Sequence, residues 1–167
     1  MFNILFLCTG NSCRSILAEA YLNHIGKGRF HAYSAGSNPT GEVNPRSLET
    51  LKSQGISTDG LRSKSWEELQ GTRFDLVVTV CDNAAGESCP IFPGAPLKVH
   101  WGVPDPAHFE GTAEETTAEF KRVFDMLKAP IDQLTQLHVE DQGHALAAHL
   151  KTIGVPSNDT AVTPGRI

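Results

Sequence analysis

Residues 8–15, CTGNSCRS, place a thiol and a guanidinium where both can contact one anion. Cys8 follows the apolar run NILFL, which predicts a buried strand, and Arg14 opens a segment with apolar residues at helical spacing. In such a strand, loop and helix, backbone N–H groups of the loop and first helical turn converge on a bound anion. Gly10 permits the tight curl, and the fork of Arg14 matches two oxygens of a tetrahedral oxyanion such as phosphate or arsenate. We therefore predict an oxyanion cradle made of Thr9, Gly10, Asn11, Ser12, Cys13 and Arg14.

Cys8 is the candidate nucleophile of this cradle. The helix N-terminus, the Arg14 guanidinium and the Ser15 hydroxyl all favour the thiolate, which is the form of cysteine that attacks. We therefore expect the pKa of Cys8 to lie well below that of an isolated cysteine. The alternative for Cys8 is an inert core thiol at the end of a strand. Cys13 needs only to pack, and we expect it to be inert.

Two more cysteines occur in the middle of the chain. Cys81 ends the β-branched run DLVVTV, and Cys89 follows in a loop rich in glycine, proline and small residues. The two thiols lack the C-x2-C spacing of a zinc site, and no nearby pair of histidines completes a tetrahedral set. His100 and His108 are interpreted as a strand-end residue and a loop residue. We therefore expect no bound metal.

The elements that must position these residues alternate along the chain. Strands are predicted over residues 3–7, 30–34, 75–80 and 97–100. Helices are predicted over residues 14–25, 45–54 and 113–137, with a short helix at SWEEL. This order indicates an α/β fold with a doubly wound four-stranded parallel sheet flanked by helices. Ligands of such sheets bind at the carboxyl ends of the strands, where Cys8, Cys81 and the loop after His100 all lie.

Length and composition limit the classes of protein to be considered. With 167 residues we expect one domain over 1–137, together with a tail over 138–167 that belongs to the same domain. Residues 139–154 of this tail predict a short helix, and residues 155–167 predict an irregular terminus. The net charge of −5 argues against nucleic-acid binding. The apolar N-terminus is too short for a signal peptide or a membrane span, so we expect a cytoplasmic monomer whose cysteines are reduced.

Residues 1–137 resemble the low-molecular-weight tyrosine phosphatase family. The family pattern is C-x5-R-S near the N-terminus and an Asp-Pro pair far downstream, matched here by Cys8 to Ser15 and by Asp105-Pro106 in WGVPDPAHFEG. In that family the aspartate protonates the leaving oxygen. The resemblance therefore implies that Asp105 is a general acid.

Within this fold, the sequence resembles the arsenate reductases more than the phosphatases. The phosphatases usually place tyrosines directly after Asp-Pro, whereas Ala107, His108 and Phe109 follow here. The segment CDNAAGESC, which supplies Cys81 and Cys89, and the phrase HWGVPDPAH are both similar to the reductases.

This resemblance implies a relay of three thiols. Cys8 would attack arsenate, and Cys81 would then attack Cys8, release arsenite and leave a disulfide. Cys89 would attack Cys81 in turn and regenerate the nucleophile. No bound cofactor is expected. The compact members that use thioredoxin lack the C-terminal tail, and relatives with a tail are linked to glutathione and glutaredoxin. The resemblance therefore implies either thioredoxin or glutathione with glutaredoxin as the external reductant.

The resemblance also concerns a cation beside the cradle. Some relatives bind potassium through Asn, Glu, Ser and a distal Asp. Asn11, Glu19 and Ser34 match the first three, but Lys64 stands in the place of the Asp. We therefore expect no potassium ion.

Two other functions stay open on the sequence alone. One is a low-molecular-weight protein tyrosine phosphatase that uses the same cysteine, arginine and aspartate without the two later thiols. The other is an oxyanion-binding or thiol-sensing module without turnover.

Overall fold

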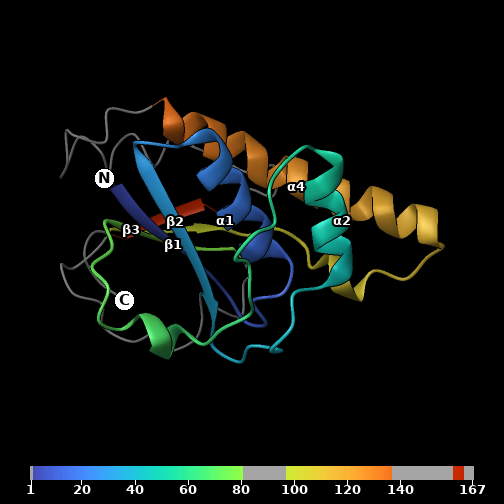
Figure 1. Cartoon of the computed structure of the whole chain (residues 1–167), viewed down its shortest axis with the longest axis horizontal. Coiled ribbons are helices and arrows are strands. Elements are labelled where there is room, and N and C mark those ends of the chain that lie inside the picture. The colour runs from blue at the N-terminus through green and yellow to red at the C-terminus, as the bar shows by residue number, and fades with distance from the viewer. Residues whose placement is uncertain (1, 81–96, 137–159, 164–167) are drawn as a thin grey trace.

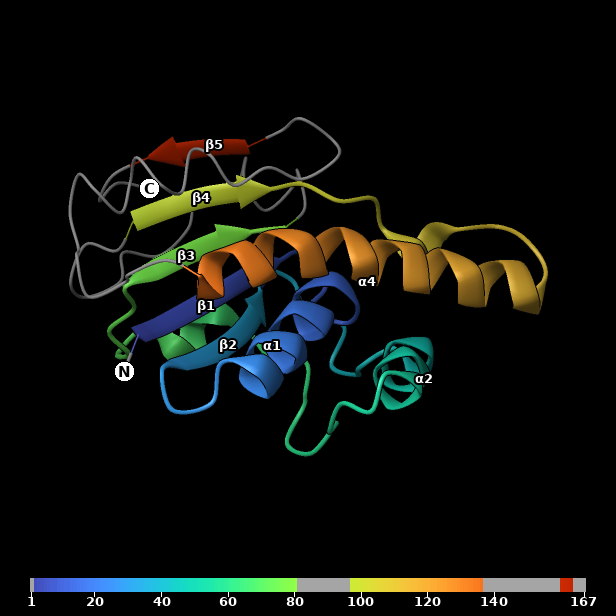
Figure 2. The same ribbon diagram turned by 90° about the horizontal axis from the view of Figure 1, so that it is seen from above.

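The computed structural model describes residues 2–80 and 97–136 and the backbone of residues 160–163. Its strands form one sheet in the order β2-β1-β3-β4-β5, and Figure 2 shows them side by side. The strands are β1 (Phe2–Cys8), β2 (Phe30–Gly36), β3 (Leu76–Thr79), β4 (Leu97–Trp101) and β5 (Thr160–Thr163). The pairs β1–β2, β1–β3 and β3–β4 are all parallel, which confirms the predicted four-stranded parallel sheet.

β5 is a fifth strand that the sequence analysis did not predict. The irregular terminus expected over residues 155–167 is wrong for Thr160–Thr163, which pair antiparallel to β4. Four residues are too few to give a clear periodic signal, and they form a strand because the edge of β4 offers N–H and C=O groups for pairing. The helix expected over residues 139–154 lies outside the described residues.

The helices lie close to their predicted positions. α1 (Arg14–Ile25) is as predicted, while α2 (Pro45–Ser53) and α4 (Ala113–Thr135) end slightly earlier. Asn44 caps α2 by accepting a hydrogen bond from the Arg46 N–H. Thr112 and Glu115 form a reciprocal capping box at the start of α4. Two 3-10 helices, η1 (Trp66–Leu69) and η2 (Pro106–His108), complete the described elements.

The sheet separates two hydrophobic clusters. Alternate residues of β1 point to opposite faces, so Ile4 and Phe6 belong to one cluster and Leu5 and Leu7 to the other. The larger cluster packs under α1 and α4, which Figure 1 shows lying across the sheet. The smaller cluster packs against η1. Burial on both faces explains why β1 reads as a continuous apolar run.

The carboxyl end of β1 leads directly into α1, with only residues 9–13 between them. This junction places the predicted cradle at the edge of the sheet where α1 begins, as the fold class implies. Within the described ranges, no helix is both long enough and apolar enough to cross a membrane.

Candidate functional site

The loop between β1 and α1 turns its carbonyl groups away from its centre. Three of these carbonyls accept backbone hydrogen bonds from residues 38–44, at N···O distances of 3.0, 3.0 and 3.1 Å: Thr9, Gly10 and Ser12. In a planar trans peptide the N–H points opposite to the C=O. The N–H groups of Gly10, Asn11 and Cys13 therefore point to the other side, toward the interior of the loop. The structure thus gives the loop the polarity of an anion cradle.

Asn11 holds the loop from behind. Its side chain is fully buried and its φ is 48°, a conformation that asparagine tolerates better than most residues. Its Oδ1 accepts a hydrogen bond from the Lys64 N–H at 2.8 Å, and its Nδ2 donates to Ser15 Oγ at 2.8 Å. A backbone N–H can only donate, which fixes the orientation of the amide. Ser15 Oγ must therefore accept from Asn11, so its own proton is directed elsewhere.

Gly36 allows β2 to approach the loop closely. It pairs with Cys8 in the sheet register. A Cβ at this position would lie 2.4 Å from the Thr9 carbonyl oxygen and 3.0 Å from the Cys8 carbonyl oxygen. Both obstacles are backbone atoms of the loop, so a side chain here would displace the cradle itself. The sequence analysis missed this residue, since a glycine at a strand end has no distinctive pattern.

We expect Gly36→Ala to disturb the cradle. Moving the loop backbone should weaken phosphate binding about tenfold and cost about 1–3 kcal/mol of stability, as overpacking does elsewhere. The measurements are phosphate protection of Cys8 from alkylation and thermal unfolding. Gly71→Ala is the matched control, because a Cβ there meets nothing within 4 Å. Equal effects of the two substitutions would contradict the close approach.

Arg14 and Asp105 come together across the mouth of the loop. Arg14 Nη2 lies 3.3 Å from Asp105 Oδ2, and Arg14 Nη1 donates to the Val103 carbonyl at 3.2 Å. The buried Nε of Arg14 has no hydrogen-bond partner among the described residues. A buried donor without a partner is costly, and an oxyanion in the cradle would supply the acceptor. Arg14, the predicted oxyanion ligand, and Asp105, the general acid that the resemblance implies, therefore lie side by side.

Asp105 is the N-cap of η2, and both of its side-chain oxygens have polar neighbours. Its Oδ1 accepts a hydrogen bond from the Ala107 N–H at 2.9 Å. His108 Nε2 lies 3.3 Å from the same Oδ2 that faces Arg14, and the His108 side chain is largely exposed. Asp105 therefore has cationic or donor groups on both oxygens.

The two described cysteines differ in their surroundings. Cys8 ends β1 at the base of the loop, while Cys13 immediately precedes α1 with its Sγ 3.7 Å from Ser12 Oγ. Burial raises the pKa of the Cys13 thiol, opposed by hydrogen bonds to the hydroxyls of Ser47 and Ser12. This supports the prediction that Cys13 packs rather than reacts.

We expect Cys13 to resist alkylation at pH values where Cys8 reacts. A raised pKa keeps Cys13 as the neutral thiol, so its thiolate appears only at a more alkaline pH than for an isolated cysteine. Iodoacetamide labelling between pH 6 and 8, localised by fragmentation of the peptide 1–14, measures both sites. The unfolded protein, in which both thiols should react similarly, is the control. Equal labelling of the two in the folded protein would contradict the assignment.

Cys81 and Cys89 lie outside the described residues. The chain is described up to Val80, whose N–H donates to the Leu7 carbonyl at 3.0 Å. Val80 and Leu7 each directly precede a cysteine of the predicted relay, Cys81 and Cys8. No group of three or more potential metal ligands is found in the described part of the chain. His100 lies in β4 with its Nδ1 2.7 Å from Thr79 Oγ1, and His108 ends η2.

Comparison with known proteins places the chain in a family. Residues 3–145 match the family described as low molecular weight phosphotyrosine protein phosphatase, and the chain belongs to that family. Its curated relatives include arsenate reductases. That of Halalkalibacterium halodurans is 43% identical over 122 residues, covering 73% of this chain and 86% of the relative. That of Bacillus subtilis is 41% identical, with the same coverage.

The solved structures that match the chain include arsenate reductases and a low molecular weight protein tyrosine phosphatase. A structure described as an arsenate reductase in the phosphate binding state is 26% identical, with a TM-score of 0.64, covering 81% of this chain and 98% of that one. The thioredoxin-dependent arsenate reductase of Corynebacterium glutamicum is 27% identical, with a TM-score of 0.54, covering 79% of this chain and 62% of that one.

Proposed function

We propose that this protein reduces arsenate to arsenite, with Cys8 as the nucleophile. The observation that carries the proposal is the inward N–H polarity of the loop, combined with the Nε of Arg14 at its mouth, which has no hydrogen-bond partner within the described ranges. Both features suit a tetrahedral oxyanion. The arsenate reductases at about 40% identity support arsenate as that oxyanion.

Arg14, Ser15 and Asp105 would each serve the first chemical step. Arg14 would exchange Asp105 for two oxygens of arsenate, which neutralises the charge of the substrate. Ser15 accepts a hydrogen bond from Asn11, so its hydroxyl proton is available to stabilise the Cys8 thiolate. Asp105, once separated from Arg14, would protonate the oxygen that leaves arsenic when the sulfur–arsenic bond forms. That oxygen leaves as water.

The second step would transfer two electrons to arsenic. The Cys81 thiolate would attack Cys8 Sγ, and the electron pair of the sulfur–arsenic bond would pass to arsenic, which leaves as arsenite. A Cys8–Cys81 disulfide results. The contact between Leu7 and Val80 supports this pairing, because it brings the residues before both thiols together.

Regeneration would use Cys89 and an external reductant. Cys89 would attack Cys81, release Cys8 as a thiolate and leave a Cys81–Cys89 disulfide for reduction. The thioredoxin-dependent relative from Corynebacterium glutamicum favours thioredoxin as the partner, and glutathione with glutaredoxin is the alternative. A relay of reduced thiols requires a reducing compartment, so we infer a cytoplasmic protein.

We also infer a single domain that includes the C-terminal tail. The hydrogen bonding of β5 to β4 supports this, since Val162 pairs with Val99 in the centre of the short ladder. Thr160–Thr163 add a strand to the sheet of the domain over residues 1–137, so we infer that the tail over residues 138–167 is part of that domain.

The decisive experiment is arsenite release from arsenate by the purified protein. We expect turnover with thioredoxin, its reductase and NADPH, or with glutathione and glutaredoxin, and phosphate should compete with arsenate. Hydrolysis of an aryl phosphate without arsenite release would support the phosphatase alternative instead. Oxyanion binding without either reaction would support the binding module.

A further inference from the structure

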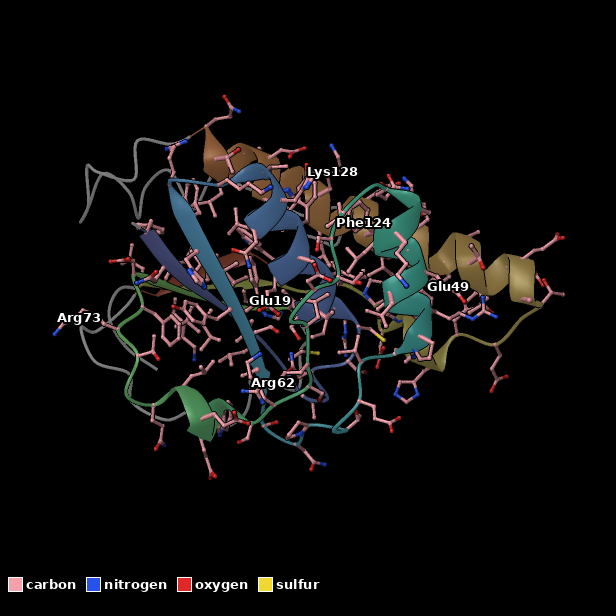
Figure 3. The ribbon with its side chains drawn as sticks, in the orientation of Figure 1. Glu19, Glu49, Arg62, Arg73, Phe124 and Lys128 are labelled. Atoms are coloured by element: carbon pink, nitrogen blue, oxygen red, sulfur yellow. The ribbon has the colours of Figure 1, made fainter. Side chains whose placement is uncertain are left out.

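Two charged residues lie behind the cradle and take no part in the proposed chemistry: Lys64 is buried and Glu19 is partly buried. Glu19 is on α1, and the side chain of Lys64 belongs to the segment between α2 and η1 and is only 9% exposed. Figure 3 labels Glu19 on α1 and Arg62 on that neighbouring segment. Buried charges of this kind are rare unless they are paired.

Hydrogen bonds hold both residues in defined positions. Ser34 Oγ donates to Glu19 Oε1 at 2.6 Å, and Lys64 Nζ donates to the Arg62 carbonyl at 3.5 Å. Burial raises the pKa of Glu19, and the charge of Lys64 opposes that shift. Burial likewise lowers the pKa of Lys64, and the charge of Glu19 opposes it. Each residue therefore stabilises the charged form of the other.

The backbone of Lys64 connects two parts of the site. Its N–H donates to Asn11 Oδ1 at 2.8 Å, and its carbonyl accepts from the Gly36 N–H at 2.9 Å. Asn11 in turn donates to Ser15, which lies one helical turn before Glu19 on α1. The two hydrogen bonds of Asn11 thus span α1 and the Lys64 segment. Glu19 and Lys64 belong to these same two elements, and their opposite charges act between them.

We propose that Glu19 and Lys64 act together as positioning residues, whose opposite charges hold α1 and the Lys64 segment at the separation that Asn11 bridges. Asn11 then keeps the loop carbonyls turned outward and the Ser15 hydroxyl available to Cys8. Neither charged side chain needs to touch the oxyanion. This inference rests on the proposed oxyanion function and adds the residues that shape the cradle.

A double-mutant cycle tests the inference with Glu19→Gln, Lys64→Met and the combined variant. Phosphate affinity, measured by protection of Cys8 from alkylation, should fall about tenfold in each single variant, because the remaining charge has lost its opposite partner. The combined variant should bind more tightly than either single variant. The pH midpoint of Cys8 alkylation should rise in the single variants and return toward wild type in the combined one. A general loss of stability would not move that midpoint.

The controls separate the charge from packing and from folding. Lys64→Arg keeps the charge and should retain affinity within about threefold. Lys121→Met and Asp125→Asn remove an exposed ion pair of α4 and should change nothing. If a single variant does not fold, the combined variant still tests the proposal. Phosphate affinity of the combined variant close to that of wild type supports the pair. A loss of about 100-fold, the product of two tenfold losses, overturns it.

Failure of this inference can be distinguished from failure of the proposed function. Phosphate protection requires only the cradle, so the cycle can be measured even if the wild-type protein releases no arsenite. If the wild-type protein releases arsenite but the Glu19 and Lys64 substitutions reduce phosphate affinity independently, the proposed function stands and the positioning pair is overturned.

Discussion

Replacing Cys8 with serine should abolish arsenite release, with a loss of at least about 10³-fold, while phosphate binding stays within about threefold of wild type. A serine hydroxyl is not ionised by the cradle at neutral pH. It also cannot form a disulfide, so it cannot supply the two electrons that arsenic needs. The inward N–H groups and Arg14 remain in this variant, which is why the anion should still bind. Calorimetric titration with phosphate and an arsenite assay measure the two properties.

Arg14→Ala is the contrasting variant. It removes the guanidinium that lies at the mouth of the loop beside Asp105, so both anion binding and arsenite release should be lost. If Cys8→Ser lost phosphate binding as completely as Arg14→Ala, the effect would lie in the fold of the loop. If it retained arsenite release, another thiol would be the nucleophile.

Cys81→Ser and Cys89→Ser should stop the reaction at different stages. With Cys81 replaced, the adduct on Cys8 has no internal thiol to attack it, and we expect no arsenite. With Cys89 replaced, each chain should release about one arsenite and then stop, trapped as a Cys8–Cys81 disulfide. Rapid-quench arsenite measurement and mass mapping of disulfides distinguish these states, and multiple turnover should fall at least about 10²-fold in both variants.

Turnover of Cys89→Ser and of wild type with each reductant shows which reductant regenerates Cys8. Sustained turnover of Cys89→Ser with glutathione and glutaredoxin would contradict an internal relay through Cys89. The thiol that regenerates Cys8 would then come from outside the protein. Turnover of wild type with thioredoxin but not with glutathione would support the relay in its complete form.

The part of the molecule that could be predicted from sequence is the part whose signals are local. β1, the loop and α1 are contiguous, and the change from an apolar run to helical spacing at Arg14 defines them. The four parallel strands were also predictable, since β-branched and apolar runs of this kind are buried on both faces. Family resemblance then connected Asp105 to the loop, and the ion pair with Arg14 confirms their proximity.

The remainder depends on contacts between distant segments. No sequence pattern indicates that Gly36 must approach the Thr9 carbonyl, because that requirement arises only when β2 lies beside β1. The resemblance places Lys64 where some relatives carry an Asp, but no sequence pattern indicates that Lys64 is buried or that its backbone bonds to Asn11. β5 was missed because its pairing with β4 depends on tertiary contact and not on its own composition.

The hydrogen bonds at the two ends of residues 81–96 limit how far Cys81 and Cys89 can lie from the sheet. Leu97 donates to the Asp75 carbonyl, and Val80 donates to the Leu7 carbonyl, so both are fixed to the sheet. Residues 81–96 therefore join two anchored points. Covalent geometry limits Cys81 to about 3.8 Å from its anchor, measured between Cα atoms, whereas Cys89 can extend roughly 26 Å from Leu97. In the proposed relay, this connectivity would give short reach to the thiol that attacks Cys8 and longer reach to the thiol that passes the disulfide to the reductant.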